Sequence, residues 1–263
     1  MRSVNSRQST ETMNQVALVT GGGKGIGEAI AMALARQGIR VAVASRTLSD
    51  VERVAAAIRE RGGDAMAVVC DVTQPDSIAA AMARIGKITI LVNNAGASAS
   101  HKFVGHDDAL WHQMIDVNLN STYYVTKAVV PMMIDANWGR IINIASVASK
   151  VGGKYIAAYT AAKHGVLGLT RALAVELVAH NITVNAICPG YVDTPMTDRS
   201  IDNIVARTQL SQADARAVLE KTNPQNRLIA PEEVAAVALM LVGEDARGIT
   251  GQAINVDGGA VQF

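Results

Sequence analysis

TGGGKGIG, residues 20–27, is a glycine-rich turn between an apolar run, VALVT at 16–20, and an amphipathic segment, EAIAMALARQG at 28–38. The run predicts a buried strand, and the segment after the glycines predicts a helix. This arrangement is typical of a nucleotide-phosphate site, because glycines let the backbone approach a pyrophosphate and the helix N-terminus offers free N–H groups. The spacing differs from the common G-x-G-x-x-G and is Gly21-x3-Gly25-x-Gly27. The alternative is a flexible turn without a ligand.

Apolar runs alternate with helical patterns along the rest of the chain. Strands are expected at residues 16–20, 40–45, 65–70, 89–93, 139–145, 182–187 and 253–256. Helices are expected at residues 25–37, 49–61, 75–85, 108–137, 155–179 and 231–242. This alternation predicts an α/β fold: a Rossmann-like, doubly wound, seven-stranded parallel sheet with helices on both faces. No repeat or linker divides residues 14–263, so a single domain is expected there.

Composition narrows the class of partner. The 263 residues carry a formal net charge of +1, which gives no indication of a nucleic-acid surface. Cys70 and Cys188 lack metal-ligand spacing and are expected to be small buried residues, so no metal site is predicted. Residues 1–13 are polar and are expected to be a flexible tail rather than a signal peptide. With no apolar stretch long enough to span a bilayer, we expect a cytoplasmic protein without a membrane partner.

A second group of residues carries chemistry. Tyr159 and Lys163 lie four positions apart in YTAAK, so a helix would place both on one face. A nearby cation favours the ionised phenol, and a phenol with a lowered pKa can exchange a proton with an alcohol or ketone oxygen. Upstream lie Asn118 and Ser146, whose ordinary alternatives are a residue bonding its own helix backbone and a strand-end hydroxyl. For Tyr159 and Lys163, the alternative is that both are ordinary residues on a solvated helix face.

Together these motifs resemble the short-chain dehydrogenase/reductase family in its single-domain form, over nearly the whole chain from about residue 15. The resemblance rests on TGGGKGIG (20–27), CDVT (70–73), NNAG (93–96), Asn118, Ser146, YTAAK (159–163), CPGYVDTPM (188–196) and TGQAINVDGG (250–259). It implies hydride transfer between C4 of a nicotinamide and a carbonyl carbon, with no metal.

The resemblance also implies roles for four catalytic residues. Ser146 would orient the substrate oxygen, and Tyr159 would donate or accept the proton. Lys163 would bind the nicotinamide ribose and lower the pKa of the tyrosine, and Asn118 would hold a water that links Lys163 to solvent.

The end of the second expected strand bears on the cofactor. It reads Ala44-Ser45-Arg46, without the acid that an NAD site usually places there to bind the ribose 2′-hydroxyl. Arg46 offers a planar cation suited to a 2′-phosphate, and Lys24 can reach the same group. We therefore predict NADP(H); the alternative is a solvated Arg46 and a bystander Lys24. The expected cofactor-binding residues are Gly21, Lys24, Gly25, Ile26, Gly27, Ser45, Arg46, Asp71, Val72, Asn94, Ala95, Gly96, Tyr159, Lys163, Pro189, Gly190, Val192 and Thr194.

The residues expected to form the substrate pocket are mostly small or apolar, as is usual for a largely apolar cleft. They are Ser98, Ser146, Val147, Ala148, Gly153, Ile156, Tyr159, Tyr191 and Met196. AYTAAKHGVLGLTRAL and ITVNAICPGYVDTPM most resemble 3-oxoacyl-thioester reductases and aromatic polyketide ketoreductases. That resemblance implies a 3-oxoacyl chain on acyl carrier protein or coenzyme A. The alternatives are a secondary alcohol or hydroxyacyl dehydrogenase of a degradation pathway, and a non-catalytic NADP(H)-binding protein, against which the complete set of four catalytic residues argues.

Three further expectations concern surfaces. The polar segment 195–227 is expected to be a lid over the substrate, the alternative being a plain pair of surface helices. An acyl-carrier partner would need a basic rim, for which the candidates are Lys102, Lys150, Lys154 and Arg199. The long helices at 108–137 and 155–179 pair between subunits in the family, so a homotetramer is expected.

Overall fold

The computed structural model describes residues 15–263, and the tail expected at residues 1–13 lies outside them. One sheet with the order β3-β2-β1-β4-β5-β6-β7 runs through the described part, and every neighbouring pair is parallel. The strands are β1 (Val16–Thr20), β2 (Arg40–Ser45), β3 (Ala65–Val69), β4 (Ile90–Asn93), β5 (Gly139–Ile144), β6 (Ile182–Pro189) and β7 (Ala253–Val256). The predicted fold class is confirmed, and each strand begins and ends within two residues of its expected bounds.

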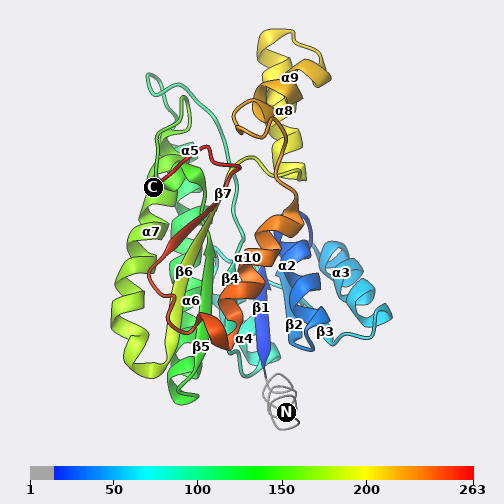
Figure 1. The fold of residues 1–263 in the computed structure, drawn as a ribbon, viewed down its shortest axis with the longest axis vertical. Coiled ribbons are helices and arrows are strands. Elements are labelled where there is room, and N and C mark those ends of the chain that lie inside the picture. The colour runs from blue at the N-terminus through cyan, green and yellow to red at the C-terminus, as the bar shows by residue number, and fades with distance from the viewer. Residues whose placement is uncertain (1–14) are drawn as a thin grey trace.

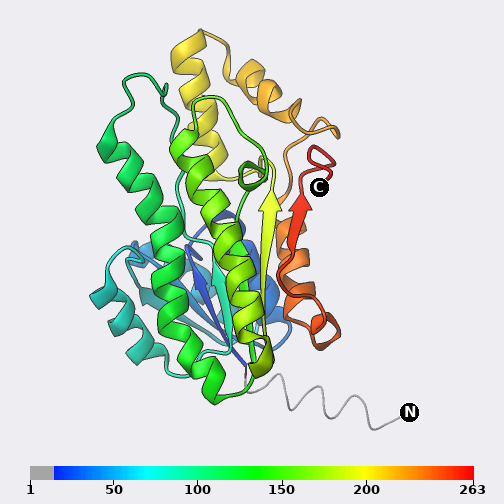
Figure 2. The same cartoon turned by 90° about the vertical axis from the view of Figure 1, so that its left-hand side faces the viewer.

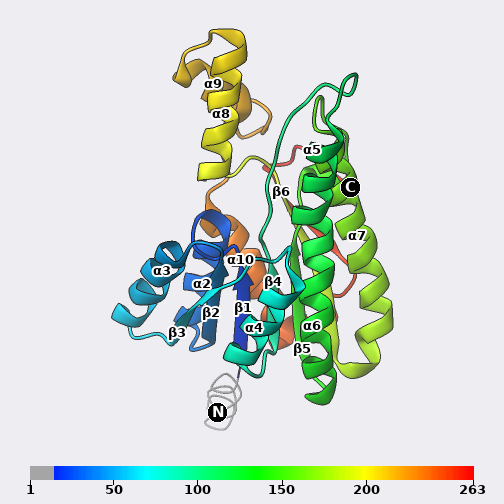
Figure 3. The same cartoon turned by 180° about the vertical axis from the view of Figure 1, so that it is seen from behind.

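Helices cover both faces of the sheet, as Figures 1 and 3 show from opposite sides. One face packs on α2 (Gly25–Arg36), α3 (Leu48–Glu60) and α10 (Pro231–Val242). The other packs on α4 (Pro75–Ile85), α6 (Ser121–Asp135) and α7 (Ala157–Leu177). Successive residues of β1 illustrate why the strands are apolar throughout: Ala17 and Val19 join the first core and Leu18 joins the second.

The prediction of a single helix at 108–137 is wrong, because a π segment, Asp116–Asn120, separates α5 (Asp108–Ile115) from α6. Within it the Asn118 amide donates to Met114 O at 2.9 Å, and the Ser121 hydroxyl donates to Val117 O at 2.8 Å. Side chains that bond the preceding turn compete with the regular helix ladder, which is a recognised cause of such breaks.

The helix predicted at 155–179 begins at Ala157, two residues late. Tyr155 has φ +66°, in the left-handed region, so it cannot be part of a right-handed helix. At the other end a short 3₁₀ turn, Val178–His180, follows α7. Figure 2 shows α6 and α7 side by side along the flank of the sheet.

Two helices stand above the carboxyl ends of the strands, α8 (Pro195–Thr208) and α9 (Gln212–Glu220) (Figures 1 and 3). They have a small core of their own, made by Ile201, Ala215, Leu219 and Leu228. An ion pair of 2.8 Å between Arg216 Nη2 and Asp193 Oδ2 ties α9 to the segment after β6. The 195–227 segment is thus a packed helix pair, and its action as a lid stays a prediction.

A buried polar chain joins the sheet to the two long helices. The Asn93 amide donates to Thr126 Oγ1 and to Asn143 Oδ1, both at 2.9 Å. The Asn143 amide donates in turn to Thr170 Oγ1 at 2.9 Å, and that hydroxyl donates to Val166 O at 2.7 Å. The chain crosses from β4 and β5 to α6 and α7, so it fixes how both helices sit on the sheet.

Replacing the middle of this chain should destabilise the protein. Asn143→Leu leaves an amide hydrogen of Asn93 without its acceptor and Thr170 Oγ1 without its donor, which should lower the free energy of unfolding by about 1–3 kcal/mol. Urea denaturation would measure the change. As a control for the same kind of substitution, Gln113→Leu on the exposed face of α5 should stay within about 0.5 kcal/mol of the wild type. An Asn143→Leu variant as stable as that control would show that the chain contributes little.

Candidate active site

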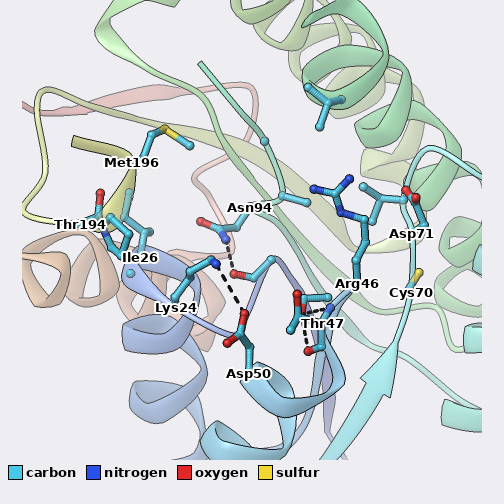
Figure 4. Close-up of a pocket in the computed structure, with 18 of the residues that line it drawn as sticks. Lys24, Ile26, Arg46, Thr47, Asp50, Cys70, Asp71, Asn94, Thr194 and Met196 are labelled. Carbon is cyan, nitrogen blue, oxygen red and sulfur yellow. Dashed lines mark hydrogen bonds and ion pairs between the residues drawn. The ribbon is translucent and has the colours of Figure 1, made fainter. Parts of the chain in front are cut away.

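A cavity opens at the carboxyl ends of β1 to β4, beside the N-terminus of α2, and Figure 4 shows its lining. The strand order reverses between β1 and β4, and such a switch point is where doubly wound sheets bind ligands. Twelve of the predicted cofactor-binding residues line it: Gly21, Lys24, Gly25, Ile26, Ser45, Arg46, Asp71, Val72, Asn94, Ala95, Gly96 and Thr194. The sequence prediction missed the lining residues Thr47, Asp50, Cys70, Thr73, Val117 and Pro195.

The glycine turn is held tightly against the segment after β4. The Asn94 amide donates to Thr20 O at 3.0 Å and to Gly21 O at 3.1 Å, and Thr20 Oγ1 accepts from the backbone N–H groups of Asn94 and Ala95. A Cβ on Gly27 would collide with Gly21 O and Asn94 Nδ2, which explains why glycine stands there. Gly27 lies behind the turn in this way and does not line the cavity.

The start of α2 is free to meet an anion. Gly25, its first residue, has φ +57°, and the N-cap residue Lys24 makes no side-chain cap. The first N–H groups of the helix therefore lack a side-chain acceptor and, with the positive end of the helix dipole, suit a phosphate.

Lys24, Arg46 and Asp50 line the same cavity. The Lys24 Nζ lies 3.5 Å from Asp50 Oδ2, and the two side chains point toward one another in Figure 4. Asp50 escaped the sequence prediction because T-x-x-D at the start of a helical pattern reads as a helix cap. Thr47 makes no such cap hydrogen bond, which leaves Asp50 facing the turn.

Asp71 occupies the far end of the cavity, at the end of β3. Its Oδ1 accepts from the backbone N–H of Thr73 at 3.0 Å and from the Thr73 hydroxyl at 2.8 Å. Burial by itself raises the pKa of this carboxyl, but the hydrogen bonds from Thr73 and the charge of Arg46 outweigh it, so the pKa lies below its ordinary value. Asp71 is therefore a hydrogen-bond acceptor at neutral pH.

Tyr159 and Lys163 lie on one face of α7, as predicted, with Lys163 Nζ 5.7 Å from the centre of the tyrosine ring. Lys163 is buried and donates to Ile144 O at 2.8 Å. Burial lowers the pKa of Lys163 to about 8, and the neighbouring Cys188 opposes part of this shift. An ammonium so close to neutrality can release a proton at modest free-energy cost.

Ser146 lies next to Tyr159, at the end of β5. Its hydroxyl accepts from Ala148 N–H at 3.1 Å, and its backbone N–H donates to Ser149 Oγ at 3.1 Å, so a short 3₁₀ turn, Val147–Ser149, holds it in place. Ser146 is thus more than a loose strand-end hydroxyl.

The pKa of Tyr159 departs from the prediction made for it. Burial raises the pKa of the phenol above its ordinary value, and the hydrogen bonding of Ser146 offsets this only in part. The direction is opposite to the expected lowering, because loss of solvent outweighs the polar neighbours. A phenol of raised pKa stays protonated near neutral pH, which suits a proton donor to a ketone oxygen.

Asn118 fastens the loop after β4 to the helices. Its Nδ2 donates to Ala97 O and to Met114 O, both at 2.9 Å, while its Oδ1 accepts from Ala97 N–H at 3.2 Å. A Cβ on Gly96 would lie 2.7 Å from Asn118 Oδ1 and 3.7 Å from Lys163 Nζ, so the three residues meet at one point. The helix-bonding alternative thus describes the side chain in part, and the water-holding role stays a prediction.

The remaining predicted residues differ in whether they line the cavity. Met196 lines it from the start of α8, whereas the other substrate candidates, Ser98, Ser146, Val147, Ala148, Gly153, Ile156, Tyr159 and Tyr191, do not. Nor do Lys163, Pro189, Gly190 and Val192, of which Val192 is buried and bridges to Ile229.

The four basic-rim candidates do not behave alike. Lys150 Nζ donates to Ala253 O at 2.9 Å and to Phe263 O at 2.6 Å, so it is committed to the chain itself. Arg199 lines the cavity, and Lys102 and Lys154 are exposed.

No helix within residues 15–263 is long and apolar enough to cross a membrane. No three His, Cys, Asp or Glu side chains within the same range are grouped so as to hold a metal ion.

The chain is similar over nearly its full length to known dehydrogenases and reductases. The family model for short chain dehydrogenases matches residues 15–204. The ketoacyl reductase assigned to the monensin polyketide synthase of Streptomyces virginiae is 43% identical over 260 residues, covering 97% of this chain and 100% of that protein. The 3-oxoacyl-[acyl-carrier-protein] reductase of Pseudomonas aeruginosa is 39% identical over 249 residues, covering 93% and 96%. A crystal structure of a variant actinorhodin polyketide ketoreductase with NADPH superposes with a TM-score of 0.90 at 38% identity, covering 95% of this chain and 98% of that one.

The buried ammonium of Lys163 should make stability depend on pH. The pKa of Lys163 is about 8 in the folded protein, against an ordinary value of 10.5 for the lysine of an unfolded chain. The unfolded chain therefore binds more protons between these values, and the folded state gains stability as pH rises through them. Relative to Lys163→Met, the wild type should gain about 3 kcal/mol in the free energy of unfolding between about pH 7 and pH 10.5.

Denaturant titrations at several pH values would measure this difference between the two proteins. As a control, Lys221→Met at an exposed lysine should leave the wild-type pH profile unchanged in shape. Parallel profiles for the wild type and Lys163→Met would contradict the buried charge.

Proposed function

The chain belongs to the short-chain dehydrogenase/reductase family, and on that premise we propose that it is an NADP(H)-dependent oxidoreductase that interconverts a ketone and a secondary alcohol. The observation that carries the proposal is the meeting of Ser146, Tyr159 and Lys163 beside the cavity that the glycine turn lines. A non-catalytic nucleotide-binding protein would have no need for a buried lysine beside a half-buried tyrosine.

Each side chain has a place in the reduction. When bound, a reduced nicotinamide supplies the hydride that the carbonyl carbon receives. Ser146 donates a hydrogen bond to the carbonyl oxygen and orients it, and Tyr159 passes its phenolic proton to that oxygen as the alcohol forms. Lys163 stabilises the negative charge left on the phenol and can return a proton, because its own pKa lies near 8. The reverse sequence of the same steps oxidises the alcohol.

The preference for NADP(H) is supported by charge at the ribose end of the cavity. Arg46, just after β2, and Lys24, at the start of α2, both line it, and Arg46 presents a planar guanidinium suited to a phosphate. The actinorhodin ketoreductase variant was solved with NADPH, which points the same way.

For the substrate we propose a 3-oxoacyl thioester carried on acyl carrier protein or coenzyme A. Support comes from the names of the relatives, a ketoacyl reductase and a 3-oxoacyl-[acyl-carrier-protein] reductase. Assays with NADPH and NADP⁺ against 3-oxoacyl thioesters and simple ketones and alcohols would test it. Faster turnover of a 3-hydroxyacyl thioester with NADP⁺ than of its ketone with NADPH near neutral pH would favour the degradative alternative.

The proposal extends to the domain organisation, the oligomeric state and the location of the protein. Residues 14–263 would act as one domain, with α8 and α9 as a lid over the substrate. The protein would be a homotetramer, and exposed apolar side chains on α6 and α7, such as Tyr123 and Val175, support a buried contact there. Cys70 and Cys188 are free thiols, as suits a cytoplasmic location.

Removing the phenolic hydroxyl should nearly abolish turnover. Tyr159→Phe keeps the ring's packing and takes away the proton donor, so kcat should fall by about 10³-fold or more while NADPH still binds. Steady-state rates and the fluorescence of bound NADPH would measure both quantities. Tyr155→Phe, a matched change at an exposed tyrosine just before α7, should keep the wild-type rate. A Tyr159→Phe variant with a tenth of wild-type kcat would refute the assignment.

Reversing the charge at the end of β2 should shift the cofactor preference. Arg46→Asp removes a phosphate ligand and adds a carboxylate that repels the 2′-phosphate but accepts from a ribose hydroxyl, so the NADPH-to-NADH ratio of kcat/KM should fall by about tenfold or more. Arg61→Asp, at the exposed far end of α3, gives the same change in net charge and should leave the ratio as it is. Equal ratios in the two variants would mean that Arg46 does not contact the phosphate.

A further inference from the structure

Three cations surround the glycine turn, and two of them already have acidic partners. Arg53 pairs with Glu28 at 2.7 Å, and its guanidinium also donates to Gly23 O at 2.8 Å, so it braces the turn. Lys24 pairs with Asp50 at 3.5 Å. Arg46 takes part in none of the ion pairs between residues 15–263, and in Figure 4 it lies apart from the Lys24–Asp50 pair.

The pair between Lys24 and Asp50 lies inside the cavity. Both residues line it, and 58% and 32% of their side chains are exposed. The glycine turn can approach Asp50 closely because residue 23 has no side chain: a Cβ on Gly23 would lie 2.7 Å from the Cβ of Asp50. The turn and the first turn of α3 are thus in contact, which keeps the carboxylate within reach of the lysine.

We propose that Asp50 is a specificity-determining residue that weakens the protein's preference for NADP(H) by holding Lys24. This inference rests on the proposed binding of NADP(H) in the cavity. A 2′-phosphate can use Lys24 fully only if the lysine leaves Asp50, and the carboxylate is then left without its partner beside a dianion. A ribose 2′-hydroxyl makes no such demand. The pair therefore lowers the affinity for NADPH and leaves that for NADH nearly unchanged.

A purely structural role for Asp50 makes a different prediction. An acid in the first turn of a helix stabilises it through the helix dipole, and Asp50 holds that position in α3. If this were its only role, removing the charge would lower stability and would affect both dinucleotides alike.

The direct test compares the dissociation constants of NADPH and NADH for the wild type and Asp50→Asn, measured by the fluorescence of the bound nucleotide. We expect Asp50→Asn to bind NADPH about two- to fivefold more tightly, the range that an exposed ion pair allows, with NADH within error of the wild type. Asp64→Asn is the matched control, because Asp64 forms a similar exposed pair, 3.6 Å from Arg40, away from the cavity. An unchanged ratio of the two constants, or weaker binding of NADPH, would overturn the proposal.

A double-mutant cycle asks whether the effect passes through the lysine. In a Lys24→Met background, Asp50→Asn should tighten NADPH binding by less than half as much, on a logarithmic scale, as it does in the wild type. An undiminished effect would mean that Asp50 acts on the phosphate directly and would overturn the role given to the pair.

The two proposals fail in distinguishable ways. If the wild type binds NADH as tightly as NADPH and Arg46→Asp changes nothing, the proposed cofactor preference is wrong. The ratio of the NADPH and NADH dissociation constants can still differ between the wild type and Asp50→Asn, because this comparison measures binding and needs no turnover. If the preference holds and Asp50→Asn leaves the ratio alone, only the present inference is lost.

Discussion

The contact between the glycine turn and the segment after β4 is the constraint on which the site depends. Thr20 and Asn94 exchange four hydrogen bonds with the backbone of the two segments, and the glycines leave no side chain in the way. This clasp sets the distance between the start of α2 and the loop that carries Gly96. Gly96 in turn lies against Asn118 and near Lys163. The same contact therefore positions both the phosphate-binding end and the catalytic end of the site.

Much of this arrangement could be predicted, because hydrophobic period and glycine spacing are local signals. All seven strands and the face shared by Tyr159 and Lys163 follow from such patterns. The π segment could not be found this way, because side-chain bonds to the preceding turn, such as that from Asn118 to Met114 O, leave no mark in the hydrophobic period. Asp50 escaped for a similar reason: its importance lies in a contact with a turn that is distant in sequence, and a helix cap explains it equally well.

The catalytic pair shows how burial acts on groups of opposite type. Loss of solvent disfavours a charged form, so it raises the pKa of the phenol of Tyr159 and lowers the pKa of the ammonium of Lys163. A sequence pattern indicates that the two groups are near one another, and proximity alone predicts a lowered phenol pKa. How far the two groups are removed from solvent depends on the surrounding structure. For the pKa of Tyr159, this loss of solvent has a larger effect than the nearby lysine. The result is a phenol that keeps its proton and a lysine able to give one up.

The π segment between α5 and α6 has a consequence for how this site could change. Each residue of a helix turns the chain by about 100°, so one residue more or fewer rotates everything before it. Deleting a single residue between Asp116 and Asn120 would make the helix regular, yet it would swing α5 away from its contacts and move Asn118 off the loop that it holds. The irregular segment therefore acts like a one-residue insertion in a regular helix. It keeps the side-chain amide of Asn118 directed at Ala97. A variant selected only for helical regularity would gain backbone order and lose the alignment of the site.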